Sequence, residues 1–170
     1  MKLLIVSDSH GDGDILQELK ARHSQEVDYM VHCGDSELSS DRAEITGYVA
    51  VRGNCDADAR YKNEELIETD NGKVWITHGH LYGVKSSLLG LSLRAKEVAA
   101  RIVCFGHSHQ LGAEMVDQIL YLNPNSISLP RHPKEKTYMM VDWTAEKVVV
   151  SIWTRDGVEL EEWQQSFSFA

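Results

Sequence analysis

The chain has 170 residues, of which 42% are hydrophobic and 25% are charged, as in an ordinary soluble globular protein. This length allows one domain with a substantial core and is short for two, so we expect residues 1–170 to form a single domain. No apolar stretch approaches the ~20 residues of a membrane-spanning helix, so no membrane partner is expected. The net charge is −9 and no block rich in Lys or Arg occurs, which argues against extended nucleic acid as a partner.

The start of the chain and its cysteines indicate a cytoplasmic protein. Residues 1–8 lack the long apolar segment and the small-residue cleavage site of a signal peptide, and they predict a first strand instead. Cys33, Cys55 and Cys104 form no CxxC pair and leave one thiol over in any disulfide scheme, which suits a reducing compartment. No patch in the sequence decides the oligomeric state, so a homo-oligomer stays open.

Five short apolar runs predict buried parallel strands, because strands covered on both faces read as continuous apolar sequence. The runs cover residues 3–6, 29–33, 48–52, 74–76 and 102–105. After the first run, the polar turn 11–14 carries a helix cap, and helical apolar spacing follows that ends near Arg22. Residues 36–44 predict a short polar helix and residues 85–101 a longer one. Strands alternating with helices indicate βαβ units and a largely parallel sheet.

The last third of the chain changes character and predicts an antiparallel meander. Its apolar runs predict strands over residues 119–122, 138–143, 148–154 and 158–163. Asp156-Gly157 is a strong hairpin signal, and residues 144–146 supply another short connection. Such a meander would form or complete a second sheet packed on the first. The expected fold class is therefore a layered α/β sandwich.

Each of the five apolar runs ends in a polar cluster rich in Asp, His, Asn and Gly. Open α/β sheets bind ligands beyond the carboxyl ends of their strands, so these clusters are expected at one sheet edge. An extended backbone would send two side chains that are two residues apart to the same side. Asp8 and His10 have this spacing, and His107 and His109 repeat it. The potential metal ligands are Asp8, His10, Asp35, Asn54, His78, His107 and His109.

This donor set is too large for one tetrahedral zinc ion, whose catalytic sites use three protein ligands and water. It suits two divalent ions that share a bridging carboxylate. Asp8 and Asp35 contribute −2 against +4 from the ions, which leaves the site positive enough for an anionic substrate in a negative protein. A mixed set of oxygen and nitrogen donors without thiolate suits Mn²⁺, Fe²⁺, Zn²⁺ or Ni²⁺, with Mg²⁺ also open. We expect Mn²⁺ first among these.

In this order, the motifs resemble the signature of the calcineurin-like metallophosphoesterases. Size and the segment 53–56 are similar to the small bacterial and archaeal branch typified by the YfcE phosphodiesterase. The resemblance implies a four-layer αββα sandwich of two mixed sheets, with a binuclear site at the sheet edge. It also implies two ligand sets that share Asp35 as a bridge. One set is Asp8, His10, Asp35 and His109, and the other is Asp35, Asn54, His78 and His107.

The resemblance implies further roles close to the metals. Many relatives carry a histidine after the Gly-Asn pair, thought to protonate the leaving oxygen or to contact phosphate, where this chain has Cys55. A thiol is a poorer proton donor, so activity would favour esters with good leaving groups. His80 is a candidate for phosphate contact or proton relay, and Asp56 for orienting a histidine ligand. Asn125 replaces the glycine of an Asn-Pro-Gly-Ser loop, and Asn tolerates the left-handed backbone that glycine would adopt.

The expected reaction is metal-assisted hydrolysis of a small phosphoester, in which a hydroxide that bridges the two ions attacks phosphorus in line. Asp35, Asn54, His80 and Cys55 are the candidate catalytic residues. A diester is favoured over a monoester, because few Lys or Arg residues stand in the motifs to match extra negative charge. The alternative is a non-catalytic metal-binding scaffold for protein–protein interaction, a use known for this fold in the retromer. A hydrolase with one metal would leave several ligands idle.

Overall fold

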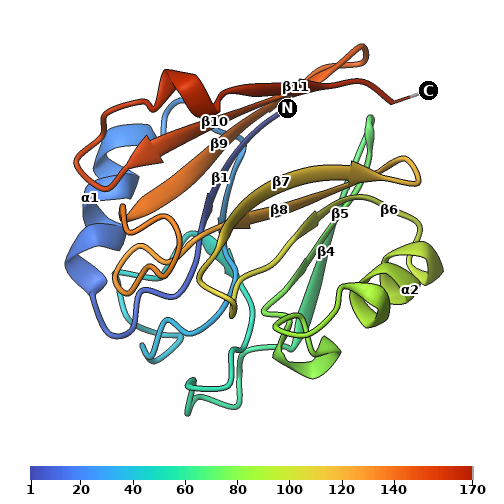
Figure 1. Ribbon diagram of the computed structural model, residues 1–170. Coiled ribbons are helices and arrows are strands. Elements are labelled where there is room, and N and C mark those ends of the chain that lie inside the picture. Colours follow the sequence, from blue (N-terminus) through green and yellow to red (C-terminus); the bar gives the residue numbers. More distant parts are fainter. Residues whose placement is uncertain (170) are drawn as a thin grey trace.

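The fold is described from a computed structural model, which defines residues 1–169. Two mixed sheets lie face to face (Figure 1). The first sheet has the strand order β11-β10-β9-β1-β2-β3. Its strands are β1 (Lys2–Val6), β2 (Tyr29–His32), β3 (Tyr48–Ala50), β9 (Thr137–Trp143), β10 (Val148–Thr154) and β11 (Gln165–Phe167).

The second sheet has the strand order β4-β5-β6-β8-β7. Its strands are β4 (Glu64–Thr69), β5 (Gly72–Thr77), β6 (Ala100–Cys104), β7 (Leu111–Val116) and β8 (Ile119–Pro124). The parallel group of the first sheet has antiparallel strands on one side, and that of the second sheet has one antiparallel strand on each side. β1, β2 and β3 run parallel, as do β5, β6 and β8. The chain therefore leaves these strands at a common edge, where the polar clusters follow.

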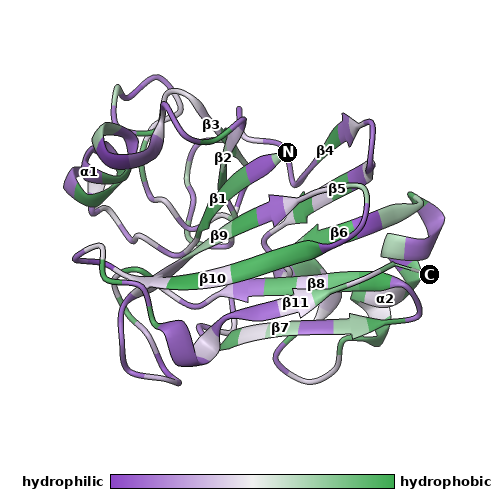
Figure 2. Ribbon diagram, turned by 90° about the horizontal axis from the view of Figure 1, so that it is seen from above, coloured by the Kyte–Doolittle hydropathy of each residue, from purple (hydrophilic) through white to green (hydrophobic). Residues whose placement is uncertain are grey.

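Alternation along the strands divides the apolar residues between the two faces of each sheet. Leu3 and Ile5 of β1 point into the core between the sheets, whereas Leu4 and Val6 face the helix α1 (Gly13–His23). On the other side, Trp75 and Val103 of the second sheet pack against α2 (Leu89–Glu97). α1 and α2 thus cover opposite outer faces, and the strand centres form the apolar middle of the molecule (Figure 2). The predicted four-layer αββα arrangement is confirmed.

All five predicted parallel runs form strands, and the predicted cap of the first helix is also confirmed. Asp12 Oδ1 accepts a hydrogen bond from the backbone N–H of Ile15 at 3.4 Å. The meander β9-β10-β11 does form, but it extends the first sheet beside β1. The second sheet is instead completed by β4 and β7, whose short and partly exposed sequences carry little apolar signal.

Three predicted elements differ from the structure. Residues 36–44 form turns and no helix, because the backbone N–H groups of Glu37 and Ser40 donate to carboxylates from another loop. The predicted helix 85–101 shrinks to α2, since β6 already begins at Ala100. Residues 158–163 contain an isolated bridge at Glu159 and the 3₁₀ turn η2 (Glu161–Trp163) instead of a full strand. Within residues 1–169, no helix is long and apolar enough to cross a membrane.

Candidate metal centre

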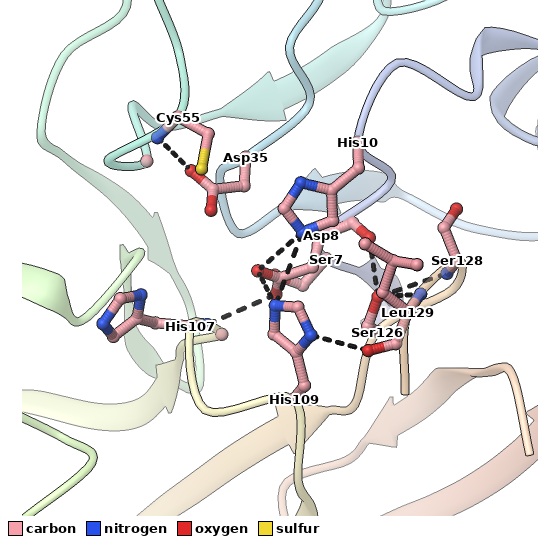
Figure 3. A network of polar contacts seen from close by, with 12 residues as sticks. Ser7, Asp8, His10, Asp35, Cys55, His107, His109, Ser126, Ser128 and Leu129 are labelled. Atoms are coloured by element: carbon pink, nitrogen blue, oxygen red, sulfur yellow. Dashed lines mark hydrogen bonds and ion pairs between the residues drawn. The ribbon is translucent and has the colours of Figure 1, made fainter. Parts of the chain in front are cut away.

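The seven predicted ligands meet at one edge of the two sheets, although they come from loops after five different strands. Figure 3 shows side chains from the loops after β1, β2 and β6 pointing toward a common centre. Among the described residues, three groups place one ligand atom each within 4.8 Å of the others. These groups are Asp8, His10 and His109; Asp35, His78 and His107; and His10, Asp35 and Cys55. The first two groups correspond to the two predicted metal sites.

The backbone at these ligands is left-handed, so the extended conformation expected for the paired ligands is wrong. φ is 55° at Asp8, 46° at His10, 65° at His107 and 54° at His109. Asp35 has the same feature, with φ of 54°. Such conformations cost about 1–3 kcal/mol each in non-glycine residues and cluster at functional sites. The chain turns sharply at each strand end, and this turn aims the side chain at the centre.

Two glycines permit the close approach of the loops. A Cβ atom added at Gly53 would overlap the carboxylate and the backbone nitrogen of Asp35. A Cβ added at Gly106 would overlap the Ser7 hydroxyl and come within 2.6 Å of Asp8 Oδ2. The missing side chains at Gly53 and Gly106 therefore let the two loops pack directly onto the two carboxylates.

The first group of ligands surrounds one oxygen of Asp8. His109 Nε2 lies 3.0 Å from Asp8 Oδ1, and His10 Nε2 lies 3.9 Å from the same oxygen. The two imidazole nitrogens are 3.4 Å apart. The other oxygen, Oδ2, accepts hydrogen bonds from the Ser7 hydroxyl and from the backbone N–H of His107 at 3.3 Å. Asp8 is thus oriented through Oδ2 and presents Oδ1 to the imidazoles.

The second group centres on His78, which is fully buried. Its Nε2 lies 3.3 Å from Asp35 Oδ2, 3.2 Å from Asn54 Oδ1 and 4.0 Å from Asp8 Oδ1. The ring of His107 stands nearby, with 5.0 Å between the ring centroids. The predicted amide ligand therefore lies beside the predicted imidazole and carboxylate ligands. Asp35 belongs to this group and to the group with His10 and Cys55, but not to the group of Asp8, His10 and His109, so its predicted role as a bridge stays a prediction.

The hydrogen bonds of the imidazoles leave lone pairs directed at this centre. His78 Nδ1 donates to the carbonyl of Cys33 at 2.7 Å, and His109 Nδ1 donates to the carbonyl of Leu129 at 2.6 Å. A carbonyl can only accept, so Nδ1 carries the proton in each ring. In the neutral rings Nε2 then holds a lone pair that faces carboxylate or amide oxygens. This arrangement is repulsive without a cation between the groups and is the one that metal-bound histidines adopt.

Asp8 supplies a second sign that a cation belongs here. Its Oδ1 is buried, and within residues 1–169 it accepts no hydrogen bond. A buried carboxylate oxygen without a donor is costly unless an ion is bound nearby. The oxygen and nitrogen donors present fit divalent ions such as Mn²⁺, Fe²⁺ or Zn²⁺, because these ions accept such mixed sets.

The ionisation of the site follows from the same crowding. Burial raises the pKa of Asp8, but the neighbouring His109 and His78 outweigh burial and bring it below its ordinary value. Burial also acts against ionised Asp35, yet contact with His78 holds its pKa well below the usual range. Burial lowers the pKa of His107 to about 4, and the charges of His78 and Lys85 act in the same direction. The carboxylates are therefore ionised and His107 is neutral at pH 7, as metal binding requires.

The loop 123–129, which resembles a family motif, supports the first ligand group. Asn125 has φ of 71°, so it does adopt the left-handed backbone expected where relatives have glycine. The Ser126 hydroxyl donates to the backbone carbonyl of Asp8 at 2.7 Å and accepts from the N–H of Leu129 at 2.7 Å. The carbonyl of Leu129 in turn holds the His109 ring (Figure 3). One loop thus fixes two ligands.

A match to a protein family decides the identity of this arrangement. Residues 1–146 match the model of the calcineurin-like phosphoesterase superfamily domain. The chain belongs to the calcineurin-like phosphoesterase superfamily. The resemblance drawn from the strand-end motifs and the enzyme class that it implied are thereby confirmed.

Similar proteins support this membership over nearly the whole length. A probable metallophosphoesterase of Bacillus subtilis, YsnB, is 42% identical over 164 residues, which cover 96% of this chain and 97% of YsnB. The crystal structure of a predicted phosphoesterase from Streptococcus pneumoniae TIGR4 has a TM-score of 0.94 at 36% identity and covers 98% of this chain and 97% of that chain. The phosphodiesterase YfcE of Escherichia coli is 26% identical over 170 residues, covering 84% of this chain and 88% of YfcE.

Cys55 and His80, the other candidate catalytic residues of this calcineurin-like phosphoesterase, lie beside the second ligand group. The Cys55 N–H donates to Asp35 Oδ1 at 2.8 Å, and its exposed thiol neighbours the Asn54 amide at 3.3 Å. Burial and Asp35 raise the pKa of Cys55 to about 11, so it carries a thiol and not a thiolate at pH 7. The ring of His80 lies 5.3 Å from that of His78. His80 Nδ1 is buried and has no partner within residues 1–169.

Within residues 1–169, no hydrogen bond or ion pair joins the Asp56 carboxylate to a histidine ring, so its predicted role is corrected. Its carboxylate instead accepts hydrogen bonds from the backbone N–H groups of Asp35 at 2.9 Å, Gly53 at 2.7 Å and Glu37 at 2.7 Å. Through these hydrogen bonds Asp56 holds together the two loops that carry Asp35 and Asn54. Sequence reasoning missed Glu37, whose Oε1 lies 2.6 Å from His10 Nδ1. The sequence signal that could have identified Glu37 is its position two residues after Asp35 of the Gly-Asp pair.

Proposed function

We propose that this protein is a hydrolase of small phosphodiesters that depends on two divalent ions. One ion would be held by Asp8, His10, Asp35 and His109, and the other by Asp35, Asn54, His78 and His107. The observation that carries the proposal is the convergence of carboxylate oxygens and imidazole nitrogens within 4.8 Å of one another in two adjacent groups. The phosphodiesterase name of YfcE supports the choice of reaction.

When bound, two divalent ions polarise the phosphoryl oxygens and lower the pKa of water toward neutrality, which makes water a competent nucleophile. Mn²⁺ is our first choice, since it accepts carboxylate, amide and imidazole donors together. The protein's part is to hold the donors rigidly. Left-handed turns aim them, and hydrogen bonds to the Cys33 and Leu129 carbonyls fix the rings of His78 and His109.

Two side chains of this chain are placed to handle the leaving group. The Cys55 thiol keeps its proton at pH 7 and lies at the exposed side of Asp35. The ring of His80 lies 5.3 Å from that of His78. Burial lowers the pKa of His80, so its neutral ring can accept or pass on a proton. A thiol is a weak acid at this pKa, and we therefore expect esters with good leaving groups to react fastest.

A diester fits the charge of the site better than a monoester dianion. Lys85, Arg52 and Arg131 are the cations whose charge reaches His107, His80 and His109, respectively. Arg52 Nε already donates to the backbone carbonyl of Asp56 at 3.3 Å. Few positive side chains thus remain for the extra charge of a monoester. The cytoplasmic location and the assembly of copies remain predictions from the sequence.

The test combines elemental analysis with hydrolysis by the wild type. Purified protein should contain about two divalent ions per chain, and with Mn²⁺ it should hydrolyse bis(p-nitrophenyl) phosphate faster than p-nitrophenyl phosphate. The reverse ratio would reject the diester preference. Binding of metal without hydrolysis of any phosphoester would favour the scaffold alternative. Asp35→Ala and His107→Ala should abolish turnover while circular dichroism stays that of the wild type. Asp70→Asn, at an exposed position outside the site, is the matched control.

A further inference from the structure

A cavity of about 210 Å³ lies beside the metal centre on the outer face of the second sheet. Its floor is formed by β7 and β8, and its walls come from the segment between η1 (His80–Tyr82) and α2. α2 packs over Trp75 and Val103, and the outward residues of the edge strand β7 (Gly112, Glu114 and Val116) are exposed. The apolar residues that line the cavity include Val84, Leu88, Phe105 and Tyr121.

The cavity is continuous with the ligand loops. Ser108, which lines it, stands between the ligands His107 and His109. The side-chain amide of Asn123 donates to the Ser108 hydroxyl at 3.0 Å and to the Gly106 carbonyl at 3.2 Å, so this end of the cavity is rigid. On the opposite wall, the charge of Lys85, next to Val84, reaches His107. Both walls of the cavity therefore begin at the metal centre.

We propose that this cavity binds the retained substituent of the phosphodiester and selects a flat, aromatic one. The inference rests on the proposed function. In an in-line displacement the leaving group departs opposite the attacking water. Attack comes from the ligand cluster, so the leaving group points away into solvent, whereas the retained ester oxygen lies to the side. The cavity adjoins the ligand loop through Ser108, so the retained substituent is the one assigned to it.

Size and charge define the class of substituent. An apolar cavity of about 150 Å³ holds benzene, so a cavity of about 210 Å³ takes one ring system and not a whole drug-sized ligand. Phe105 and Tyr121 offer aromatic surfaces that stack favourably with such a ring. The carboxylate of Glu114 lines the outer end and disfavours a substituent that carries a second anionic group. The selected substrate is therefore an aryl or heteroaryl ester with a single phosphate.

The test uses two substrates with the same leaving group, phenyl p-nitrophenyl phosphate and methyl p-nitrophenyl phosphate. Their kcat/KM ratio is divided by the ratio of their alkaline hydrolysis rates, which removes intrinsic reactivity. The wild type with Mn²⁺ should prefer the phenyl ester by at least about tenfold, the discrimination that an apolar pocket reaches for such a group. A corrected ratio near one would overturn the proposal.

Two variants test the cavity itself. A Cβ added at Gly112 meets nothing within 4 Å, so Gly112→Leu should place its side chain in the cavity without backbone strain and remove the preference. Leu88→Ala removes a wall and should reduce the preference severalfold. Val116→Leu, on the same outward face of β7, and Leu89→Ala, one residue after Leu88, are controls outside the cavity and should keep the ratio.

The outcomes separate the two proposals. If both Gly112→Leu and Leu88→Ala keep the wild-type ratio, the cavity does not bind the substituent, even though the protein remains a phosphodiesterase. If the metal-loaded wild type hydrolyses neither diester, the proposed function fails and this inference fails with it. Metal content measured on each variant shows whether the ligand loops are intact, because a change in the ratio counts only at unchanged metal content.

Discussion

His10 Nδ1 lies 2.6 Å from Glu37 Oε1, which joins a metal ligand to a carboxylate outside the recognised motifs. Glu37 reaches this position through a left-handed backbone, with φ of 55°, and its N–H donates to Asp56. Because the carboxylate accepts a hydrogen bond from His10 Nδ1–H, the lone pair of His10 is on Nε2, which faces Asp8 and His109. His78 and His109 donate instead to neutral carbonyls, so among these three rings His10 is the one oriented by a negative charge.

Glu37→Ala should weaken metal binding at the first site by about 10- to 100-fold, the usual effect of removing the carboxylate behind a metal-bound histidine. Glu37→Gln keeps an acceptor without the charge and should have an intermediate effect. Competition of the protein with a fluorescent chelator measures both affinities. Glu18→Gln, on the exposed face of α1, is the matched control. Wild-type affinity in Glu37→Ala would contradict this role.

Metal stoichiometry should distinguish the shared ligand from an unshared one. Asp35 belongs to two of the ligand groups, whereas His109 belongs to one. We therefore expect about two ions per chain in the wild type, about one in His109→Ala and less than one in Asp35→Ala. Elemental analysis after dialysis against a weak chelator measures these values. Equal metal content in the two variants would show that Asp35 does not bridge.

Gly53→Ala should damage the site by overlap and not by loss of a ligand. Its new Cβ would collide with the carboxylate and backbone of Asp35, and the surrounding loops are buried. Overpacking of this kind costs about 2 kcal/mol of unfolding free energy, and the displaced carboxylate should also bind metal more weakly. Urea denaturation of the metal-free protein measures the first effect. Gly112→Ala, where the added Cβ meets nothing within 4 Å, should leave the stability nearly unchanged.

Asp56→Asn should destabilise the metal-free protein by about 3 kcal/mol, because its amide group would face backbone N–H donors and leave some of them unpaired. The affected donors belong to Asp35, Gly53 and Glu37. Denaturation curves of the variant and of Asp70→Asn, an exposed control, give the comparison. A loss of unfolding free energy no larger than that of the control would contradict this prediction and would mean that water replaces the hydrogen bonds of the Asp56 carboxylate.

His32 should make the stability of the metal-free protein depend on pH. It is fully buried, its Nε2 lies 3.0 Å from the Ser9 hydroxyl, and its Nδ1 accepts from the Gly34 N–H at 3.2 Å. Burial lowers its pKa from 6.5 to about 4. Between these values the unfolded chain binds a proton that the folded chain excludes. The stabilisation is thus complete above pH 6.5 and is lost as pH falls toward 4, with a total of about 3 kcal/mol.

Urea denaturation in a chelator at pH 7, 6, 5 and 4.5 measures this dependence. The histidines with raised pKa values, His78 and His109, act in the opposite direction, so His32→Gln serves as the reference. The difference in unfolding free energy between wild type and variant should shrink as the pH falls. A difference that is constant over this range would exclude the assigned titration of His32.

Local patterns were enough to predict the parallel strands and the candidate ligands that gather at their ends. Each buried strand is a continuous apolar run, and each ligand follows within a few residues, so the strand and its polar end are read from one short segment. Conversely, β4 and β7 lie at the edges of the second sheet, where partly exposed residues carry a weak apolar signal. Each of them pairs with the strand that follows it along the chain, β4 with β5 and β7 with β8, and this pairing is not visible in the apolar pattern of their own residues.

The sequence by itself determined the parallel strands, the chemistry of the donors and their order, because these properties belong to residues that are close together along the chain. Only the tertiary structure decided how the donors are aimed and supported. Left-handed turns replaced the extended spacing at His10 and His109, and residues 36–44 lost their predicted helix because Asp56 binds the N–H of Glu37. Hydrogen bonds between loops far apart in sequence set these features, since they satisfy backbone donors that a local pattern assigns to a helix or a strand.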